Sequence, residues 1–147
     1  MQDLQNGEIM VTFPSRTSYV HMATMVVSNA AAIAGFDKGV AGKVAIAADE
    51  AVTNVIKHAY QGDTTKQVTL KVVITEESLI IKVFHTGKAL HKENVKLPIM
   101  SDYIKERRRG GLGLYIINKF MDEVDYQVGK QHCCQMTKYR NVDKPGG

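Results

Sequence analysis

The chain has 147 residues, 44% of them hydrophobic, which suits one domain with a sizeable core, and we expect a single domain over residues 1–147 with its core at about 8–140. Its net charge is only +4 and tryptophan is absent, which argues against direct nucleic-acid binding, because that function needs a broad basic face with aromatic side chains. No apolar run approaches the ~20 residues that span a bilayer, and the polar N-terminus is unlike a signal peptide. We read the adjacent Cys133 and Cys134 as reduced thiols on opposite faces of a strand, and we predict a cytoplasmic protein without a membrane segment.

The first half of the chain predicts one strand followed by two helices. Residues 8–13 alternate as a short strand, and residues 17–34 place small and apolar side chains along one side of a helix. We expect Met22 and Met25 of this helix to fill the core rather than to form an adaptable partner surface. A second helix is predicted over residues 37–60, where the aspartate at its start can accept hydrogen bonds from free N–H groups.

The second half of the chain predicts strands around one further helix. A β-hairpin is expected over residues 67–75 and 78–84, because apolar side chains recur at every second position on both arms. The charged stretch 86–110 is too long for an ordinary connection and is expected to be functional or mobile. The remaining elements are a helix, two strands and a frayed tail, over residues 112–121, 124–128, 132–139 and 141–147. This order predicts an α+β two-layer sandwich, in which a mixed, mainly antiparallel sheet is covered on one face by helices.

Glu50 and Asn54 form the first candidate site. They lie four residues apart, so both side chains leave the same face of a helix one turn apart. Glu50 could take a proton from a nucleophile, and Asn54 has a carbonyl oxygen suited to a hard cation such as Mg²⁺. The same spacing also occurs by chance on solvated helices, so the pair alone does not distinguish an active site from an ordinary polar face.

A glycine-rich turn that opens a helix forms the second candidate site, with the sequence Arg109-Gly110-Gly111-Leu112-Gly113-Leu114. Free backbone N–H groups and the positive end of a helix dipole suit a phosphate, and three consecutive arginines ending at Arg109 add positive charge. The turn is not a Walker A loop, since no Gly-Lys-Ser/Thr closes it, and it is not a dinucleotide fingerprint, since no strand runs directly into it. The alternative is a flexible hinge before a core helix.

The order and spacing of these two motifs resemble those of the GHKL ATPases, the histidine-kinase-like family with the Bergerat fold. Within that family the chain is most similar to the small anti-sigma-factor serine kinases, over about residues 8–140. The residues that carry the resemblance are Glu50, Ala51, Thr53, Asn54, His58, Ala59 and Tyr60, followed by Gly111, Leu112, Gly113, Leu114, Ile117, Met121, Asp122 and Val124.

The resemblance implies an ATP site between the Glu50 helix, the 86–110 segment and the glycine turn. It implies that Glu50 is the catalytic base for a serine hydroxyl and that Asn54 binds Mg²⁺. Backbone N–H groups of residues 110–114, together with Arg109, would hold the phosphate chain. Lys57 and His58 are further candidates for contact with phosphate or with the lid. Their alternative interpretation is a solvated lysine and a histidine packed at the helix end.

His85 departs from the pattern of the family that the chain resembles. The family has Asp-x-Gly after the strand predicted at 78–84, and its Asp accepts a hydrogen bond from the adenine amino group, whereas this chain has His85-Thr86-Gly87. A neutral histidine can still accept through one ring nitrogen, but a protonated one only donates. We retain His85 and Gly87 as candidate nucleotide-binding residues. Residues 89–91 and 132–133 depart as well, so the predicted divergence concentrates on the side of the site that binds the base.

The resemblance therefore implies an anti-sigma factor that binds ATP and Mg²⁺, phosphorylates an anti-anti-sigma (STAS-type) protein on serine and sequesters a sigma factor. It also allows a homodimer formed through the sheet edge or the first helix. Two alternatives stay open: a catalytically degenerate, nucleotide-independent module that binds a sigma factor or regulator, and the ATPase half of a sensor histidine kinase. A metal site at His85, His91 and His132 is disfavoured, because their spacing matches no zinc pattern.

Overall fold

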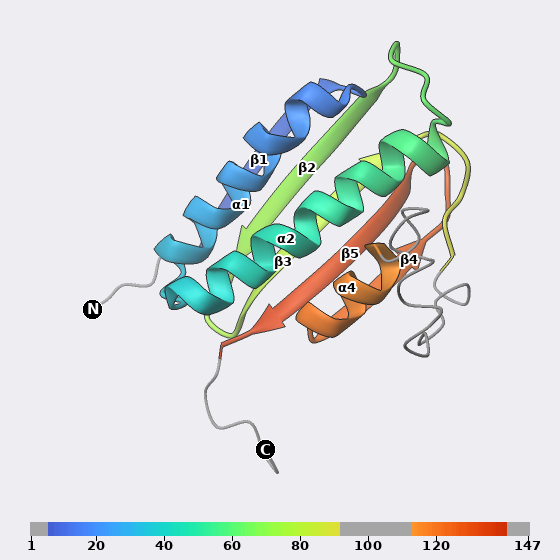
Figure 1. Ribbon diagram of the computed structural model, residues 1–147. Coiled ribbons are helices and arrows are strands. Elements are labelled where there is room, and N and C mark those ends of the chain that lie inside the picture. The colour runs from blue at the N-terminus through green and yellow to red at the C-terminus, as the bar shows by residue number, and fades with distance from the viewer. Residues whose placement is uncertain (1–5, 92–112, 141–147) are drawn as a thin grey trace, which may run out of the picture.

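The computed structural model describes residues 6–91 and 113–140, which form a five-stranded sheet covered on one face by helices (Figure 1). The strand order is β1-β2-β3-β5-β4, and all four pairings between neighbouring strands are antiparallel. The predicted α+β architecture with a single helical layer is confirmed. The parallel pairing that a mixed sheet would contain does not occur among these described strands.

The order of elements also follows the prediction. The strands are β1 (Gly7–Pro14), β2 (Gln67–Ile74), β3 (Ser78–His85), β4 (Glu123–Gln127) and β5 (His132–Tyr139). The helices are the 3-10 turn η1 (Thr17–Tyr19), α1 (Val20–Ile33), α2 (Lys38–Asn54), the π-helical turn η2 (Val55–Ala59) and α4 (Gly113–Phe120). α2 crosses the middle of the sheet between α1 and α4 (Figure 1). None of the helices within residues 6–91 and 113–140 is both long and apolar enough to cross a membrane.

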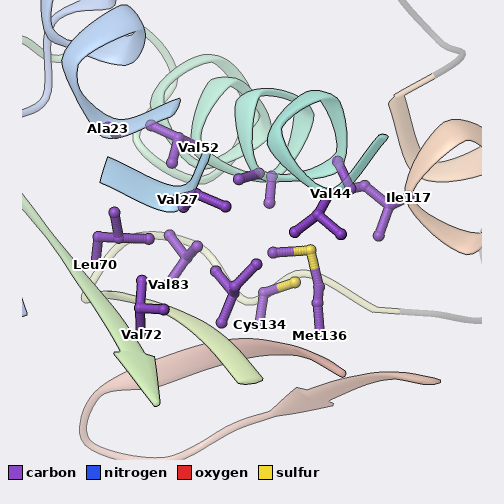
Figure 2. Packing of buried hydrophobic residues seen from close by; sticks show 14 of the residues in the cluster. Ala23, Val27, Val44, Val52, Leu70, Val72, Val83, Ile117, Cys134 and Met136 are labelled. Carbon is purple, nitrogen blue, oxygen red and sulfur yellow. The ribbon is translucent and has the colours of Figure 1, made fainter. Parts of the chain in front are cut away.

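The hairpin of β2 and β3 presents one continuous apolar face to the helices, as its alternation predicts. The strand residues that are completely buried on this face are Val68, Leu70, Val72, Leu79, Ile81 and Val83. They belong to one core cluster with helix residues, and Figure 2 shows Leu70, Val72 and Val83 below Val27 of α1 and Val44 and Val52 of α2. Each such side chain contributes about 1.5–3 kcal/mol relative to an exposed one, so this layer holds α2 in a fixed place on the sheet.

α2 begins at the predicted N-cap. The Asp37 side chain accepts a 2.8 Å hydrogen bond from the Val40 N–H, and this carboxylate satisfies one of the free donors of the first turn. The cap fixes where the helix starts, and therefore which residues of α2 face the sheet and which face α4.

The end of α2 differs from the regular helix predicted up to Tyr60. After Asn54 the chain widens into the π-helical turn η2, which a 2.8 Å hydrogen bond from the Tyr60 N–H to the Val55 carbonyl closes. Gln61 and Gly62 then adopt positive φ angles of 52° and 82° and end the helical segment, as predicted. The wider turn leaves backbone carbonyl groups at the end of α2 free for contacts outside the helix.

Two expectations about side chains have different outcomes. Met22 and Met25 are 39% and 52% exposed, so the prediction that they fill the core is wrong. The side of α1 that faces the sheet is occupied by small side chains such as Ala23 and Val27, which let the helix approach closely and turn the methionines outward.

Cys133 and Cys134 are both buried and free, which confirms the predicted reduced thiols.

Gly42 provides a test of the helix surface. It lies at an exposed position within α2, and a β-carbon added there would meet no atom within 4 Å. Because alanine favours a helix over glycine, we expect Gly42→Ala to raise the free energy of unfolding by about 0.5–1 kcal/mol in urea denaturation. Gly35→Ala is the opposite control, since the φ of +91° at Gly35 disfavours any side chain. A Gly42→Ala variant of lower stability than the wild type would contradict the described surface of α2.

Candidate functional site

Two polar side chains of α2 meet the start of α4 at one point. A β-carbon added to Gly113, the first residue of α4, would lie 2.7 Å from Glu50 Oε2 and 3.1 Å from Asn54 Oδ1. Glu50 and Asn54 therefore lie on the same side of α2, as their four-residue spacing predicts. A side chain at residue 113 would therefore meet the ends of Glu50 and Asn54, which would have to move to make room for it.

Asn54 is held in this contact without a full set of partners. Its side chain is 6% exposed, and its Nδ2 atom has no hydrogen-bond partner within the described part of the chain. Leaving a buried polar group unpaired costs about 1–3 kcal/mol, so such a group calls for an explanation. A bound ligand that accepts a hydrogen bond from this amide nitrogen would explain its position.

Glu50 lies in a setting that strengthens it as a base. Partial burial, together with the neighbouring Asp49 carboxylate, raises the pKa of Glu50 above its ordinary value, and Lys57 offsets part of this rise. A carboxylate with a raised pKa accepts a proton more readily than a solvated one. The position therefore suits proton abstraction from a weakly acidic group such as a hydroxyl.

A cavity of about 450 Å³ opens next to Asn54 and Gly113. The residues that line it are Asn54, Lys57, His58, Gln61, Lys88, Ala89, Leu90, His91, Gly113 and Leu114. Lys57 and Lys88 add positive charge to this wall, and no carboxylate belongs to its described part, so the cavity favours an anionic ligand. Glu50 is not on the wall and meets Gly113 from α2.

The wall segment after β3 is attached to the end of η2 by its backbone. The Lys88 N–H donates a 2.7 Å hydrogen bond to the Ala59 carbonyl. A β-carbon on Gly87 would lie 2.5 Å from that same oxygen, so the close approach requires glycine. The Tyr60 hydroxyl accepts a 2.9 Å hydrogen bond from the Thr86 N–H and donates one to a β2 carbonyl at 2.6 Å. The turn η2 thereby positions the residues that continue into the cavity wall.

His85, the last residue of β3, is packed inside this junction and is 2% exposed. Its ring lies edge-on to Tyr60 with the centroids 5.9 Å apart, and 5.3 Å from the ring of His132, its partner on β5. The Nδ1 atom accepts a 3.2 Å hydrogen bond from the Gly87 N–H. Burial, with a smaller effect from His132, lowers the pKa of His85 to about 4, so the ring is neutral near pH 7.

The predicted site residues fall into three groups. The first group lies on the cavity wall and consists of Asn54, Lys57, His58, Gly113 and Leu114. The second group lies beside the wall and consists of Glu50, His85 and Gly87. The third group lies outside the described residues and consists of Arg109, Gly110, Gly111 and Leu112. His58 is exposed on the wall, so the alternative in which it packs at the helix end is wrong. The functional roles of all these residues stay predictions at this point.

The sequence analysis assigned no site role to Gln61, and it included the wall residues 88–91 only as part of the 86–110 segment. Their positions in the sequence could have indicated a place at the site, because Gln61 directly follows the candidate helix and residues 88–91 directly follow Gly87. No group of three or more His, Cys, Asp or Glu side chains within residues 6–91 and 113–140 is arranged to hold a metal ion.

The buried ring of His85 makes the stability depend on pH in a defined direction. An unfolded chain protonates a histidine near pH 6.5, whereas folded His85 resists protonation until about pH 4, so the free energy of unfolding should fall as the pH drops through this window. His85→Asn should remove this part of the fall in urea denaturation at a series of pH values. His58→Asn, the same substitution at an exposed histidine, is the matched control. The same pH dependence in the wild type and His85→Asn would contradict the described burial.

Comparisons with known proteins agree with this arrangement. Residues 13–138 match the family model of the histidine kinase-like ATPase domain. The chain is 31% identical over 140 residues to the serine-protein kinase RsbW of Listeria monocytogenes, covering 92% of this chain and 89% of the relative. It is 30% identical over 135 residues to the serine-protein kinase RsbW of Bacillus licheniformis, covering 89% and 84%.

Two solved structures share the fold at low sequence identity. The RsbU and RsbW domains of a Mycobacterium tuberculosis protein match with a TM-score of 0.65 and 13% identity over 92% of this chain, which spans 34% of that longer chain. The histidine kinase domain of a blue-light-activated protein from Erythrobacter litoralis matches with a TM-score of 0.53 and 15% identity, covering 86% and 61%. These two establish the fold only, and the sequence matches decide the family. The chain belongs to the histidine kinase-like ATPase domain family and, within it, to the RsbW serine-protein kinases.

Proposed function

We propose that the chain is an anti-sigma factor with serine-protein kinase activity, which binds ATP with Mg²⁺ and phosphorylates a serine of an anti-anti-sigma partner of the STAS type. The observation that carries the proposal is the meeting of Glu50, Asn54 and Gly113 beside a cationic cavity. A base, an oxygen ligand for a metal ion and a helix N-terminus are the groups that phosphoryl transfer uses. The relatives named serine-protein kinases support the same reaction.

The residues around the cavity fit a magnesium nucleotide. The Asn54 amide nitrogen has no hydrogen-bond partner within residues 6–91 and 113–140, and the carbonyl oxygen of the same side chain is of the kind that Mg²⁺ prefers. Lys57 and Lys88 place positive charge where phosphate oxygens would lie. The volume of about 450 Å³ falls within the roughly 300–1,000 Å³ of typical small-molecule sites.

The chain's own residues divide the work of the reaction. Bound Mg²⁺ supplies charge neutralisation on the phosphate chain, and Asn54 would hold it through the side-chain carbonyl oxygen. Glu50, whose pKa is raised by burial, would accept the proton of the attacking serine hydroxyl. The N-terminus of α4 at Gly113 would direct its positive dipole end at the phosphates. Arg109 and the glycines before Leu112 are expected to complete the same phosphate site.

The proposal also includes protein partners. Met22, Met25 and Ile33 give α1 an exposed apolar surface, and methionine side chains adapt readily to a partner. This surface supports the sequestering of a sigma factor, or a homodimer through the first helix. We place these interactions in the cytoplasm, where sigma factors act.

Calorimetric titration of the full chain with ATP and Mg²⁺ tests the binding step. We expect Mg²⁺-dependent binding that Asn54→Ala weakens about tenfold or more, because the variant loses a metal ligand. Asn29→Ala, the same substitution at an exposed position of α1, should leave the affinity unchanged. Glu50→Gln should bind ATP as the wild type does, yet transfer phosphate to the partner serine about 100-fold more slowly, because the general base is lost.

Two outcomes would contradict the proposal in different ways. The mass of the STAS partner reports phosphate transfer. If the chain binds ATP but the mass of no cognate partner increases, the kinase activity is excluded. A folded wild-type chain that binds no nucleotide would instead favour a nucleotide-independent module that holds its sigma factor by surface contacts.

Gly113→Ala tests the contact between α2 and α4 directly. The added methyl group would displace the ends of Glu50 and Asn54, so we expect the affinity for Mg²⁺–ATP to fall about tenfold. The stability should change by less than about 1 kcal/mol, because these side-chain ends can move and alanine favours the helix. Calorimetry and urea denaturation measure the two effects, with Gly42→Ala as the matched control on an open helix surface. An unchanged affinity would contradict a role of this contact in binding.

A further inference from the structure

The part of α2 that leads away from the cavity carries three side chains in one row. Lys43, Ile46 and Glu50 follow one another at spacings of three and four residues, so they lie on one face of the helix. At one end of the row Glu50 meets Gly113, the first residue of α4. At the other end the Lys43 Nζ atom lies 5.8 Å from the centre of the Phe120 ring, where α4 ends. The row therefore follows the side of α2 that borders α4 (Figure 1).

Ile46 is the unusual member of this row. It is 47% exposed, and within α2, which the structure describes in full, no other large hydrophobic side chain is exposed. Lys43 is exposed as well, and it forms no ion pair with the residues that the structure describes. Single exposed hydrophobic side chains are common on protein surfaces, so Ile46 gains significance from its place one helical turn before Glu50.

The geometry of phosphoryl transfer determines from which side a serine reaches Glu50. The attacking and leaving oxygens lie roughly in line, with the phosphorus atom between them, so nucleotide and acceptor approach from opposite sides. The cavity includes Asn54 and Lys57, which follow Glu50 along α2 and η2. The acceptor therefore approaches from the side that precedes Glu50, where Ile46 and Lys43 lie.

We propose that Ile46 and Lys43 bind the segment of the partner protein that contains the phosphoacceptor serine. Ile46 contacts an apolar side chain of this segment, and Lys43 pairs with an acidic group of the partner. The inference rests on the proposed function, because it takes Glu50 as the base for the serine hydroxyl and the cavity as the nucleotide site. The row thus continues the active site onto the surface of α2.

The spacing along the helix indicates which residue of the partner meets Ile46. Ile46 lies four residues before Glu50, which is about 6 Å along the helix axis at ~1.5 Å per residue. An extended segment covers this distance in about two residues at ~3.3 Å each. The apolar side chain therefore lies about two positions from the serine. A serine without such a neighbour would leave Ile46 in water, and a basic partner surface would face Lys43 with like charge.

Steady-state kinetics of phosphate transfer to the cognate STAS partner, at saturating ATP, test the inference on the full chain. We expect Ile46→Asn and Lys43→Glu each to raise the KM for the partner about fivefold or more, with little change in kcat. The affinity for Mg²⁺–ATP in calorimetry should change less than about twofold, because neither residue belongs to the described cavity wall. The conservative variants Ile46→Leu and Lys43→Arg should keep the KM within about twofold of the wild type.

Two control variants introduce the same kinds of change elsewhere. Lys38→Glu reverses a charge at the first residue of α2. Val128→Asn removes a 59% exposed apolar side chain from the turn between β4 and β5. Both controls should keep the wild-type KM, and circular dichroism with the urea transition establishes that each variant is folded.

Substitutions in the partner test the contact of Ile46 directly. The residues two positions before and two positions after the phosphorylated serine are replaced in turn by Asn. One of these substitutions should raise the KM of the wild-type kinase about fivefold, yet have little further effect on Ile46→Asn, because residues in contact are not additive.

Three results would overturn the inference while phosphate transfer by the wild type leaves the proposed function standing. The first is a KM for the partner that is equal in the wild type, Ile46→Asn and Lys43→Glu. The second is a rise in KM that the two control variants share. The third is full additivity between Ile46→Asn and both substitutions in the partner. If the wild type transfers no phosphate to any cognate partner, the proposed function fails and the inference fails with it.

Discussion

The approach of α4 to the polar side of α2 at Gly113 is the constraint on which the site depends. The helices come so close that a side chain at residue 113 would collide with Glu50 and Asn54. Burial at this contact raises the pKa of Glu50, and the Asn54 amide nitrogen has no hydrogen-bond partner among the residues that the structure describes. The cost is offset by the apolar residues that α2 and α4 bury on the sheet, such as Val52 and Ile117. The core thus holds two polar groups in a position that they would not occupy in an isolated helix.

The second junction of the site is a backbone contact. The π-helical turn η2 ends α2 with the Ala59 carbonyl facing outward, and Gly87 and Lys88 pack against this oxygen. The contact connects the helix that carries Glu50 and Asn54 to the strand that ends in His85. Changes at the Gly113 contact should affect the ligand without loss of the sheet, because a side chain there would first meet only the side-chain ends of Glu50 and Asn54.

The parts of the fold that follow from local periodicity could be predicted, and those that follow from packing between distant segments could not. The alternation along the hairpin matches the two-residue period of a strand, and the spacing of Glu50 and Asn54 matches one turn of a helix. Both patterns therefore predict which side chains share a face. Apolar character alone does not decide which stripe of α1 faces the sheet, and small residues occupied that stripe in place of Met22 and Met25. The close contact of Gly87 with the Ala59 carbonyl joins segments that are distant in the sequence, so no local pattern encodes it.

A crystal structure of the full chain with Mg²⁺ and a non-hydrolysable ATP analogue would test the central claim most directly. We expect the metal ion to bind the Asn54 carbonyl oxygen, and the terminal phosphate to lie next to Glu50 and the N-terminus of α4 at Gly113. The wall residues Lys57 and Lys88 should face the phosphate chain. A nucleotide bound elsewhere on the chain, or a metal ion held without Asn54, would contradict the account.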